Sequence, residues 1–116
     1  MTNLKARIFI FLYFSFSINL ISDPSLLSLP QGFSIKIYAE NIQSPRQITE
    51  GSKYIFTASG SKGQIYALLD SNDNNLIDEN RIIAKDLFDS RGVTFNDGDL
   101  YFAEVDKVWV IRNIED

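Results

Sequence analysis

Apolar and polar residues alternate in short runs along this chain. In residues 33–40 an apolar residue stands at every second position, which is the pattern of a strand with one buried face. Such a run predicts a strand and not a helix, because a helix repeats its apolar face every three to four residues. The apolar members of this run are Phe33, Ile35, Ile37 and Ala39.

Residues 90–104 predict a β-hairpin. Two β-prone runs, at residues 93–95 and 100–103, flank the sequence Asn-Asp-Gly at 96–98. These three residue types favour the tight turns that join antiparallel strands. The sequence therefore predicts two paired strands with a short connection between them.

A second copy of this unit lies earlier in the chain, so the sequence contains a repeat. A period near 45 residues, with several strands in each period, is typical of a β-propeller blade, which has about four strands. The matching positions are Arg46 with Arg91 (offset 45), 55–56 with 101–102 (offset 46), and 65–68 with 108–111 (offset 43).

We therefore predict an all-β fold, namely a partial β-propeller with about two four-stranded blades of a six-bladed ring. Closing a propeller takes about four to eight blades, so the 116 residues are expected to be the first part of a longer protein. The run at 33–40 is predicted as a leading strand, the outer strand of the missing last blade, and so lacks a partner here. Strands are predicted near 47–49, 53–58, 64–69 and 81–85 in blade one (45–85), and near 92–95, 99–104 and 107–112 in the incomplete blade two (91–114).

Residues 1–22 have the pattern of a secretory signal peptide. Lys5 and Arg7 precede an apolar stretch of about 14 residues, shorter than the roughly 20 that a membrane helix needs. A periplasmic or secreted location is expected, with no stable membrane span after cleavage. An uncleaved membrane anchor or an N-terminal helix is the alternative. Residues 23–32, rich in Ser, Pro and Leu, are predicted to be a linker.

The composition limits the kinds of active site and metal site that the chain can contain. The chain has no cysteine, which excludes disulfides and cysteine-based metal or redox sites, and no histidine, which removes the commonest general base and the usual zinc ligand. The net charge is −4, and two of the basic residues, Lys5 and Arg7, lie in the predicted signal peptide. Nucleic acid is therefore not expected as a partner, because phosphate binding needs a basic face.

Residues 70–79 contain the sharpest metal-like pattern. Oxygen side chains stand at positions 1, 3, 5 and 9 of a potential calcium loop, which normally has Gly at position 6 and Glu at position 12. Asn75 and Arg81 occupy those two positions, and the loop lies between predicted strands instead of helices. An Asx-rich hairpin turn is the other interpretation, because Asn and Asp bond their own backbone. The candidate calcium ligands are Asp70, Asn72, Asn74 and Asp78.

Four motifs occur in a fixed order: LPQGFSIKIYAE (29–40), PRQ (45–47), GQIYAL (63–68) and RGVTFNDGDLYFAE (91–104). Together they resemble the N-terminal part of the glucose/sorbosone dehydrogenase family, and the resemblance covers residues 29–116. It implies an exported, six-bladed propeller oxidoreductase that oxidises a sugar substrate with pyrroloquinoline quinone as cofactor. In this family a histidine takes the hydroxyl proton as hydride passes to the quinone. This chain has no histidine, so we predict no catalytic residue and no turnover by the chain alone.

The resemblance also implies that residues at the start of each innermost strand face the central axis. Arg46 and Arg91 hold that place in the two repeats, and a guanidinium can bind a quinone carboxylate with two parallel hydrogen bonds. An ion pair with a neighbouring blade's carboxylate is the other interpretation. The predicted cofactor-binding residues are Arg46, Gln47 and Arg91, with Glu104 a weaker candidate; Trp109 is predicted to pack in the core.

Three functional hypotheses follow from the sequence. The first is the N-terminal part of an exported quinone-dependent sugar dehydrogenase, and the second is a non-catalytic exported propeller that binds a partner. The third is a self-contained small β domain. Unpaired strands at both ends would expose hydrogen-bonding groups, so self-association through open sheet edges is expected.

Overall fold

The computed structural model describes residues 23–116, and the predicted signal peptide at 1–22 lies outside the described residues. The chain divides into two compact units, Met1–Phe33 and Ser34–Asp116. In the described part of the first unit, Pro24–Leu26 forms one turn of 3-10 helix, η1, and the Asp23 side chain caps it by accepting the Ser25 N–H. Across residues 23–116, no helix has the length and apolar character that crossing a membrane requires.

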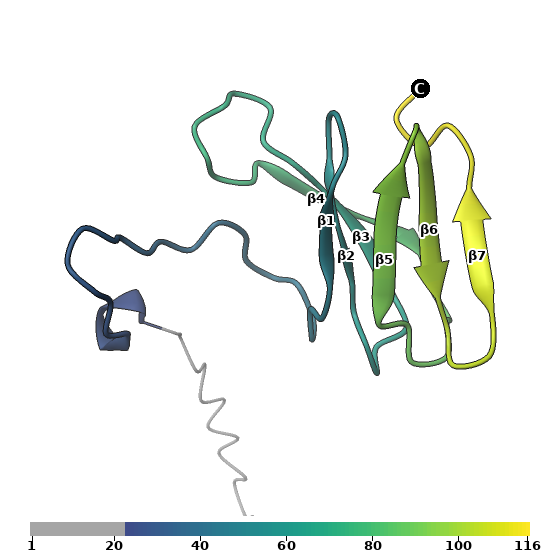
Figure 1. Ribbon diagram of the computed structural model, residues 1–116, viewed down its shortest axis with the longest axis horizontal. Coiled ribbons are helices and arrows are strands. Elements are labelled where there is room, and N and C mark those ends of the chain that lie inside the picture. The colour runs from purple at the N-terminus through teal and green to yellow at the C-terminus, as the bar shows by residue number, and fades with distance from the viewer. Residues whose placement is uncertain (1–22) are drawn as a thin grey trace, which may run out of the picture. The chain divides into compact units, whose positions relative to one another are not determined.

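The second unit consists of two antiparallel β-sheets (Figure 1). The first sheet has the order β1-β2-β3-β4 and the second has the order β5-β6-β7, so neighbours in sequence are neighbours in space. The all-β prediction is confirmed, and each predicted strand in the two repeats is present with ends within two residues of those expected. The strands are β1 (Ile48–Glu50), β2 (Ile55–Ala58), β3 (Ile65–Leu69), β4 (Glu79–Ala84), β5 (Gly92–Asn96), β6 (Asp99–Ala103) and β7 (Val108–Ile111).

The predicted hairpin between β5 and β6 is confirmed. Asn96 pairs with Asp99, and the two residues between them have positive φ, 50° at Asp97 and 82° at Gly98. Two positive φ values define the type I′ turn, whose twist matches that of the strands it joins. Local turn chemistry thus fixes the register of β5 against β6.

The core gathers side chains from both sheets. Phe56, Ala58, Ile65 and Ala67 come from the first sheet, and Val93, Leu100 and Phe102 come from the second. The rings of Phe56 and Phe95 stack across the sheets, with centroids 6.0 Å apart and planes 13° apart. The two repeats therefore share one core.

Trp109 does not belong to this core. It lies on β7, the outer strand of the second sheet, and is 46% exposed. The prediction that Trp109 packs in the core is wrong, because no further strand covers β7 among the described residues.

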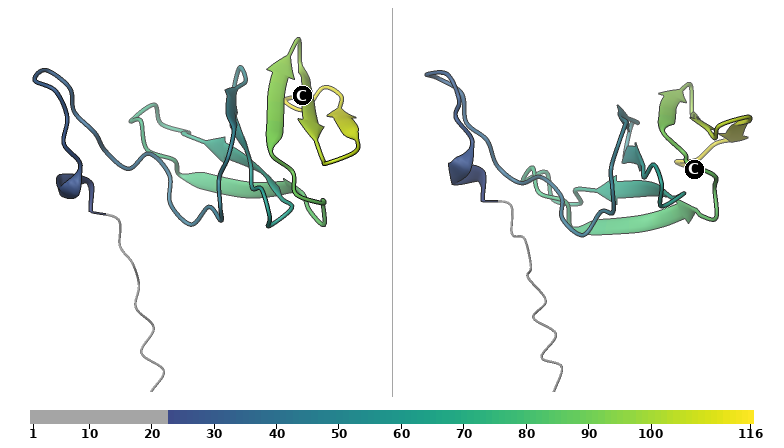
Figure 2. Two further views of the ribbon diagram at one scale, coloured as in Figure 1. Left: turned by 60° about the horizontal axis from the view of Figure 1, so that its bottom comes forward. Right: turned by 90° about the horizontal axis from the view of Figure 1, so that it is seen from below.

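β1 and β5 lie side by side and begin at the same end of their sheets (Figures 1 and 2). Instead of a strand ladder, two side chains of the first repeat bond the backbone of β5. Gln47 Oε1 accepts the Val93 N–H at 3.3 Å, and Thr49 Oγ1 accepts the Phe95 N–H at 3.2 Å. Both bonds span 46 residues, which is the period of the repeat, so they join corresponding parts of successive repeats.

The predicted leading strand at 33–40 is absent, which corrects the sequence-based expectation. Its backbone makes isolated contacts with the β3–β4 region: Tyr38 O accepts the Ile77 N–H at 3.0 Å, and Glu40 O accepts from Asn80 Nδ2 at 3.2 Å. A strand exists only through a ladder of partners, and among residues 34–116 this run has none.

Candidate functional site

Three connections meet at the end where β1 and β5 begin, which we call the inner-strand end. Gly60, in the β2–β3 turn, forms an isolated bridge with Ser90, which precedes β5. The Ser59 hydroxyl donates to Gln43 O in the segment before β1, and the Ser90 hydroxyl donates to Gln64 O. Ser59 and Ser90 are fully buried. These buried hydroxyls hold the loops that carry the predicted cofactor-binding residues.

Arg46 lies on this end with its backbone fixed and its side chain exposed. Its N–H donates to Ala58 O at 2.8 Å, which extends the β1–β2 ladder by one bond. A Cβ on Gly60 would lie 3.0 Å from Arg46 Cγ, so the Arg46 stem runs directly over Gly60. Within residues 23–116 the guanidinium takes part in none of the ion pairs, which leaves its fork of donors open to an anion.

Gln47 stabilises the fold through its side chain and its backbone. Its side-chain oxygen accepts the Val93 N–H, and its backbone oxygen accepts both the Thr57 hydroxyl and the Ala58 N–H. Gln47 also lines a shallow cavity of about 200 Å³ over β5 and β6. The side-chain amide N–H₂ is the part of Gln47 left to donate to a ligand.

Arg91 is bound to a carboxylate in the connection before β5. Its Nε and Nη2 lie 2.9 and 2.8 Å from Asp89 Oδ2. The hydrogen bond that Arg91 donates to Asp89, followed by the negative charge of Asp89, raises the pKa of Arg91. The other carboxylate oxygen, Asp89 Oδ1, is buried and has no hydrogen-bond partner among the described residues. From sequence, Arg91 is predicted to bind either a quinone carboxylate or a carboxylate of a neighbouring blade. In the structure its partner is Asp89, which lies only two residues earlier in the chain.

The loop between β3 and β4 carries the candidate calcium ligands. Asp70 accepts the N–H groups of Asn72, Asn74 and Asn75 at 3.4, 3.2 and 2.7 Å. Asn75, at the position where a calcium loop has Gly, has φ 62° and so adopts the left-handed conformation that Gly favours.

The remaining loop ligands are bonded among themselves. Asp78 accepts from the Ser71 N–H, the Ser71 hydroxyl and the Asn72 amide, and these bonds, that of the Ser71 hydroxyl first, lower its pKa. The Asn74 side chain accepts the Leu76 N–H. No cluster of three or more Asp or Glu side chains suited to a metal occurs in residues 23–116. Calcium binding by Asp70, Asn72, Asn74 and Asp78 stays a prediction.

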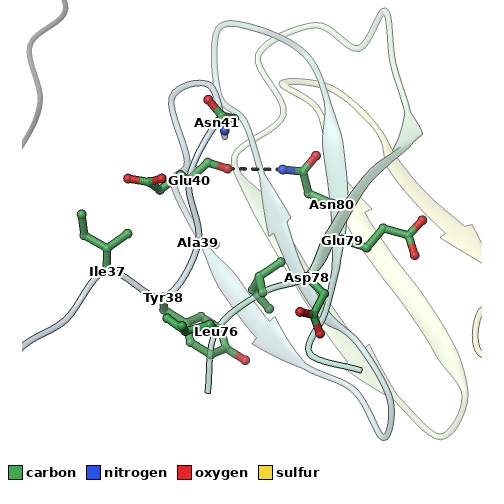
Figure 3. A pocket seen from close by; sticks show the side chains of 10 residues that line it. Ile37, Tyr38, Ala39, Glu40, Asn41, Leu76, Asp78, Glu79 and Asn80 are labelled. Atoms are coloured by element: carbon green, nitrogen blue, oxygen red, sulfur yellow. Dashed lines mark hydrogen bonds between the residues drawn. The ribbon is translucent and has the colours of Figure 1, made fainter. Parts of the chain in front are cut away.

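A larger open pocket of about 490 Å³ lies between residues 37–41 and residues 76–80 (Figure 3). Its charged lining residues are all acidic, and the carboxylates of Glu40 and Glu79 point away from each other (Figure 3). Burial raises the pKa of Tyr38 in this pocket, and the charges of Asp70 and Glu50 add to the increase. Among the predicted site residues described above, the pocket contains Asp78 alone.

Glu104 is a structural carboxylate. It accepts the Phe88 N–H at 2.6 Å and the Trp109 indole N–H at 2.9 Å, and only 8% of its side chain is exposed. The bond from Phe88, followed by that from Trp109, lowers the pKa of Glu104. Its carboxylate joins the β4–β5 connection to β7, which leaves it little capacity for a cofactor.

Sequence reasoning missed two residues that join the repeats, Thr49 and Glu115. Thr49 bonds β5 as described, and the Glu115 carboxylate accepts three N–H groups of the turn between β1 and β2. The 46-residue spacing of the Thr49 contact is visible in the repeat, but no local pattern marks Glu115.

No family model matches the chain, and no solved structure matches it. A protein of Borreliella burgdorferi, described as an uncharacterized protein, is 33% identical to it over 109 residues. The alignment covers 92% of this chain and 27% of that protein. The chain thus spans about a quarter of the length of this relative. The relative's description names no activity.

Proposed function

We propose that the two sheets are successive blades of a larger β-propeller. The support is the up-and-down order within each sheet, the parallel placement of β1 and β5, and the two bonds that repeat the 46-residue period. The relative is nearly four times as long as the matched region, which leaves room for the further blades that closure requires.

We further propose that the parent protein is an exported, quinone-dependent sugar dehydrogenase of the glucose/sorbosone type. The observation that carries this proposal is Arg46. Its guanidinium is exposed at the inner-strand end, it is unpaired within the described residues, and it is anchored on a buried loop network. Such a group fits a carboxylate of pyrroloquinoline quinone.

The residues of this chain would bind and orient the cofactor. Arg46 holds a carboxylate, and the Gln47 amide donates beside it. Arg91 contributes less, because Asp89 already occupies two of its donors. When bound, pyrroloquinoline quinone supplies the hydride acceptor. The chain has no histidine, so the histidine base that the resemblance implies would be supplied by the parent protein outside this sequence.

Titration of the chain with pyrroloquinoline quinone, followed by isothermal titration calorimetry, tests this function. We expect saturable binding that Arg46→Gln weakens about tenfold or more, because hydrogen bonds between charged groups are the strong ones. The matched control is Lys62→Gln, which removes one positive charge from the β2–β3 turn at the same end. We expect it to change the affinity less than about threefold, since Lys62 is not among the proposed cofactor-binding residues and an exposed charge without direct contact is screened by salt.

Equal weakening by Arg46→Gln and Lys62→Gln would show that binding is a general charge effect. That result, or an absence of binding, would exclude the quinone site and leave the propeller in place.

A non-catalytic exported propeller is the second candidate function. The observation that favours it is the Arg91–Asp89 ion pair, which occupies one of the two predicted cofactor-binding arginines, together with the lack of histidine. The same titration separates the two candidates, because the second predicts no saturable quinone binding.

A further inference from the structure

The turn between β1 and β2 directs three successive backbone N–H groups at one carboxylate. Glu115 Oε2 accepts the Ser52 N–H, and Glu115 Oε1 accepts the Lys53 and Tyr54 N–H groups, each at 2.9 Å. Successive N–H groups that converge in a turn form a concave anion-binding site called a nest. Both oxygens of the carboxylate are engaged, so the nest matches the shape of this group.

Gly51 makes room for the carboxylate. A Cβ at Gly51 would lie 2.3 Å from Glu115 Oε1 and 2.9 Å from Phe56 Cε2, which no side chain could avoid without moving one of them. The ammonium of Lys53, 5.1 Å from the centroid of the Tyr54 ring, places positive charge on the same turn. The turn thus combines an open backbone, three donors and a cation.

The segment after β7 presents Glu115 to this turn in a fixed position. The Asn113 N–H donates to Asp99 Oδ1 at 3.1 Å, and the Ile114 N–H donates to Gly98 O at 2.9 Å. The Ile114 side chain packs against the shared core. The second sheet therefore fixes the position of Glu115. The carboxylate binds the β1–β2 turn of the first sheet, whose donor residues lie 61 to 63 positions earlier in the sequence.

We propose that the β1–β2 turn is a carboxylate-binding site, which the chain fills with its own Glu115. The filled site is a latch that ties the segment after β7 to the first sheet. It lies beyond the C-terminal end of β1, whereas Arg46 precedes β1, so the latch is independent of the proposed quinone site. Its ligand class is a carboxylate, from the chain itself or from solution.

Amide hydrogen exchange of the full chain, measured by NMR, tests the latch. Glu115→Gln keeps the shape of the side chain but removes its charge and one acceptor oxygen. We expect exchange at Ser52, Lys53 and Tyr54 to become about tenfold faster or more, because hydrogen bonds to a charged group are lost. The control is Asp116→Asn, which removes a neighbouring charge and should leave these three amides unchanged.

Chemical rescue tests the ligand class. Glu115→Ala empties the nest, and we expect it to lower the melting temperature by about 4–8 °C, the shift that a modest loss of stability gives in a domain of this size. Sodium acetate should then raise the melting temperature of Glu115→Ala and slow exchange at the three amides, beyond the effect of sodium chloride at equal ionic strength. Wild type should not respond.

Two results would overturn the proposal. One is an equal amide exchange rate at residues 52–54 in Glu115→Gln and Asp116→Asn. This comparison requires only these two conservative variants. The other is an acetate effect on Glu115→Ala no larger than that of chloride. Neither result bears on quinone binding at Arg46, so the two proposals fail separately.

Discussion

Several carboxylates in this protein accept backbone N–H groups. Asp70 accepts three within its loop, Glu104 accepts that of Phe88 in the connection before β5, and Glu115 accepts three from the β1–β2 turn. Part of the acidic excess of the sequence therefore stabilises turns and connections. This use of charge makes the stability of the fold sensitive to acid.

At the residue scale we predict a specific pH dependence for Glu115. Burial raises its pKa, but the three bonds from Tyr54, Lys53 and Ser52 outweigh burial, so the pKa lies below the ordinary glutamate value. A lowered pKa in the folded state means that the stabilisation is complete above the ordinary value and is lost as pH falls through the folded value.

Thermal melts between pH 7 and pH 3 check this dependence. Wild type should melt above Glu115→Gln at neutral pH, and the difference should shrink in acid as the Glu115 carboxylate is protonated. Asp116→Asn should follow wild type throughout. A difference that stays constant down to pH 3 would contradict the assignment.

At the element scale, the central feature is the pairing of β1 with β5 through side chains. Gln47 and Thr49 cover two N–H groups of β5 that would otherwise remain on an open edge. An uncovered edge invites pairing with other chains. The two side chains thus satisfy β5 and also set the spacing between the repeats.

Thr49→Val should weaken this pairing. Valine has the shape of threonine without the acceptor, so the Phe95 N–H loses its partner, at a cost of about 1 kcal/mol. Denaturant unfolding and amide exchange at Phe95 measure the two effects. Thr94→Val is the matched control, because Thr94 is exposed on β5, and it should change stability by less than about 0.5 kcal/mol. Similar losses in the two variants would contradict a role for Thr49.

The strands were predictable from sequence because their signals are local. β-prone runs and the repeat predicted the seven strands, and Asn96, Asp97 and Gly98 predicted the turn between β5 and β6. The run at 33–40 alternates between apolar and polar residues but forms no strand, because alternation shows only a preference and a strand also needs a hydrogen-bonded partner.

The site was less predictable than the strands. Arg46 lies two residues before β1, close to the position expected, but Arg91 turns back to Asp89, whose φ of 51° bends the connection before β5. Motif spacing does not show a bend of this kind. Glu115 was missed because its contact depends on how two distant segments pack, and no sequence interval marks it.

At the scale of the whole molecule, each sheet ends in a strand that has no further strand beside it among residues 23–116. β4 exposes Ile82, and β7 exposes Val108, Trp109 and Val110. Apolar side chains on an open edge combine a free backbone ladder with surface that favours burial. The two outer strands are therefore the surfaces most prone to further pairing.

The chain should self-associate through these edges. We expect light scattering with size exclusion to show a mass that rises with concentration, and Val110→Lys to reduce it, because lysine on an edge strand opposes pairing. Thr94→Lys, on the covered strand β5, is the control and should not reduce it. A concentration-independent monomer with a sharp cooperative melt would instead favour a self-contained domain.

The 46-residue bonds between the sheets also set an order of events during synthesis. The first sheet joins strands that are adjacent in sequence, so it can form as it leaves the ribosome. Thr49 can form its hydrogen bond only after Phe95 has been synthesised, and the β1–β2 turn can bind Glu115 only later still. At about 5–20 residues per second, β1 spends some seconds with its inner edge uncovered. The newborn chain is therefore most exposed to misassembly before its second repeat arrives.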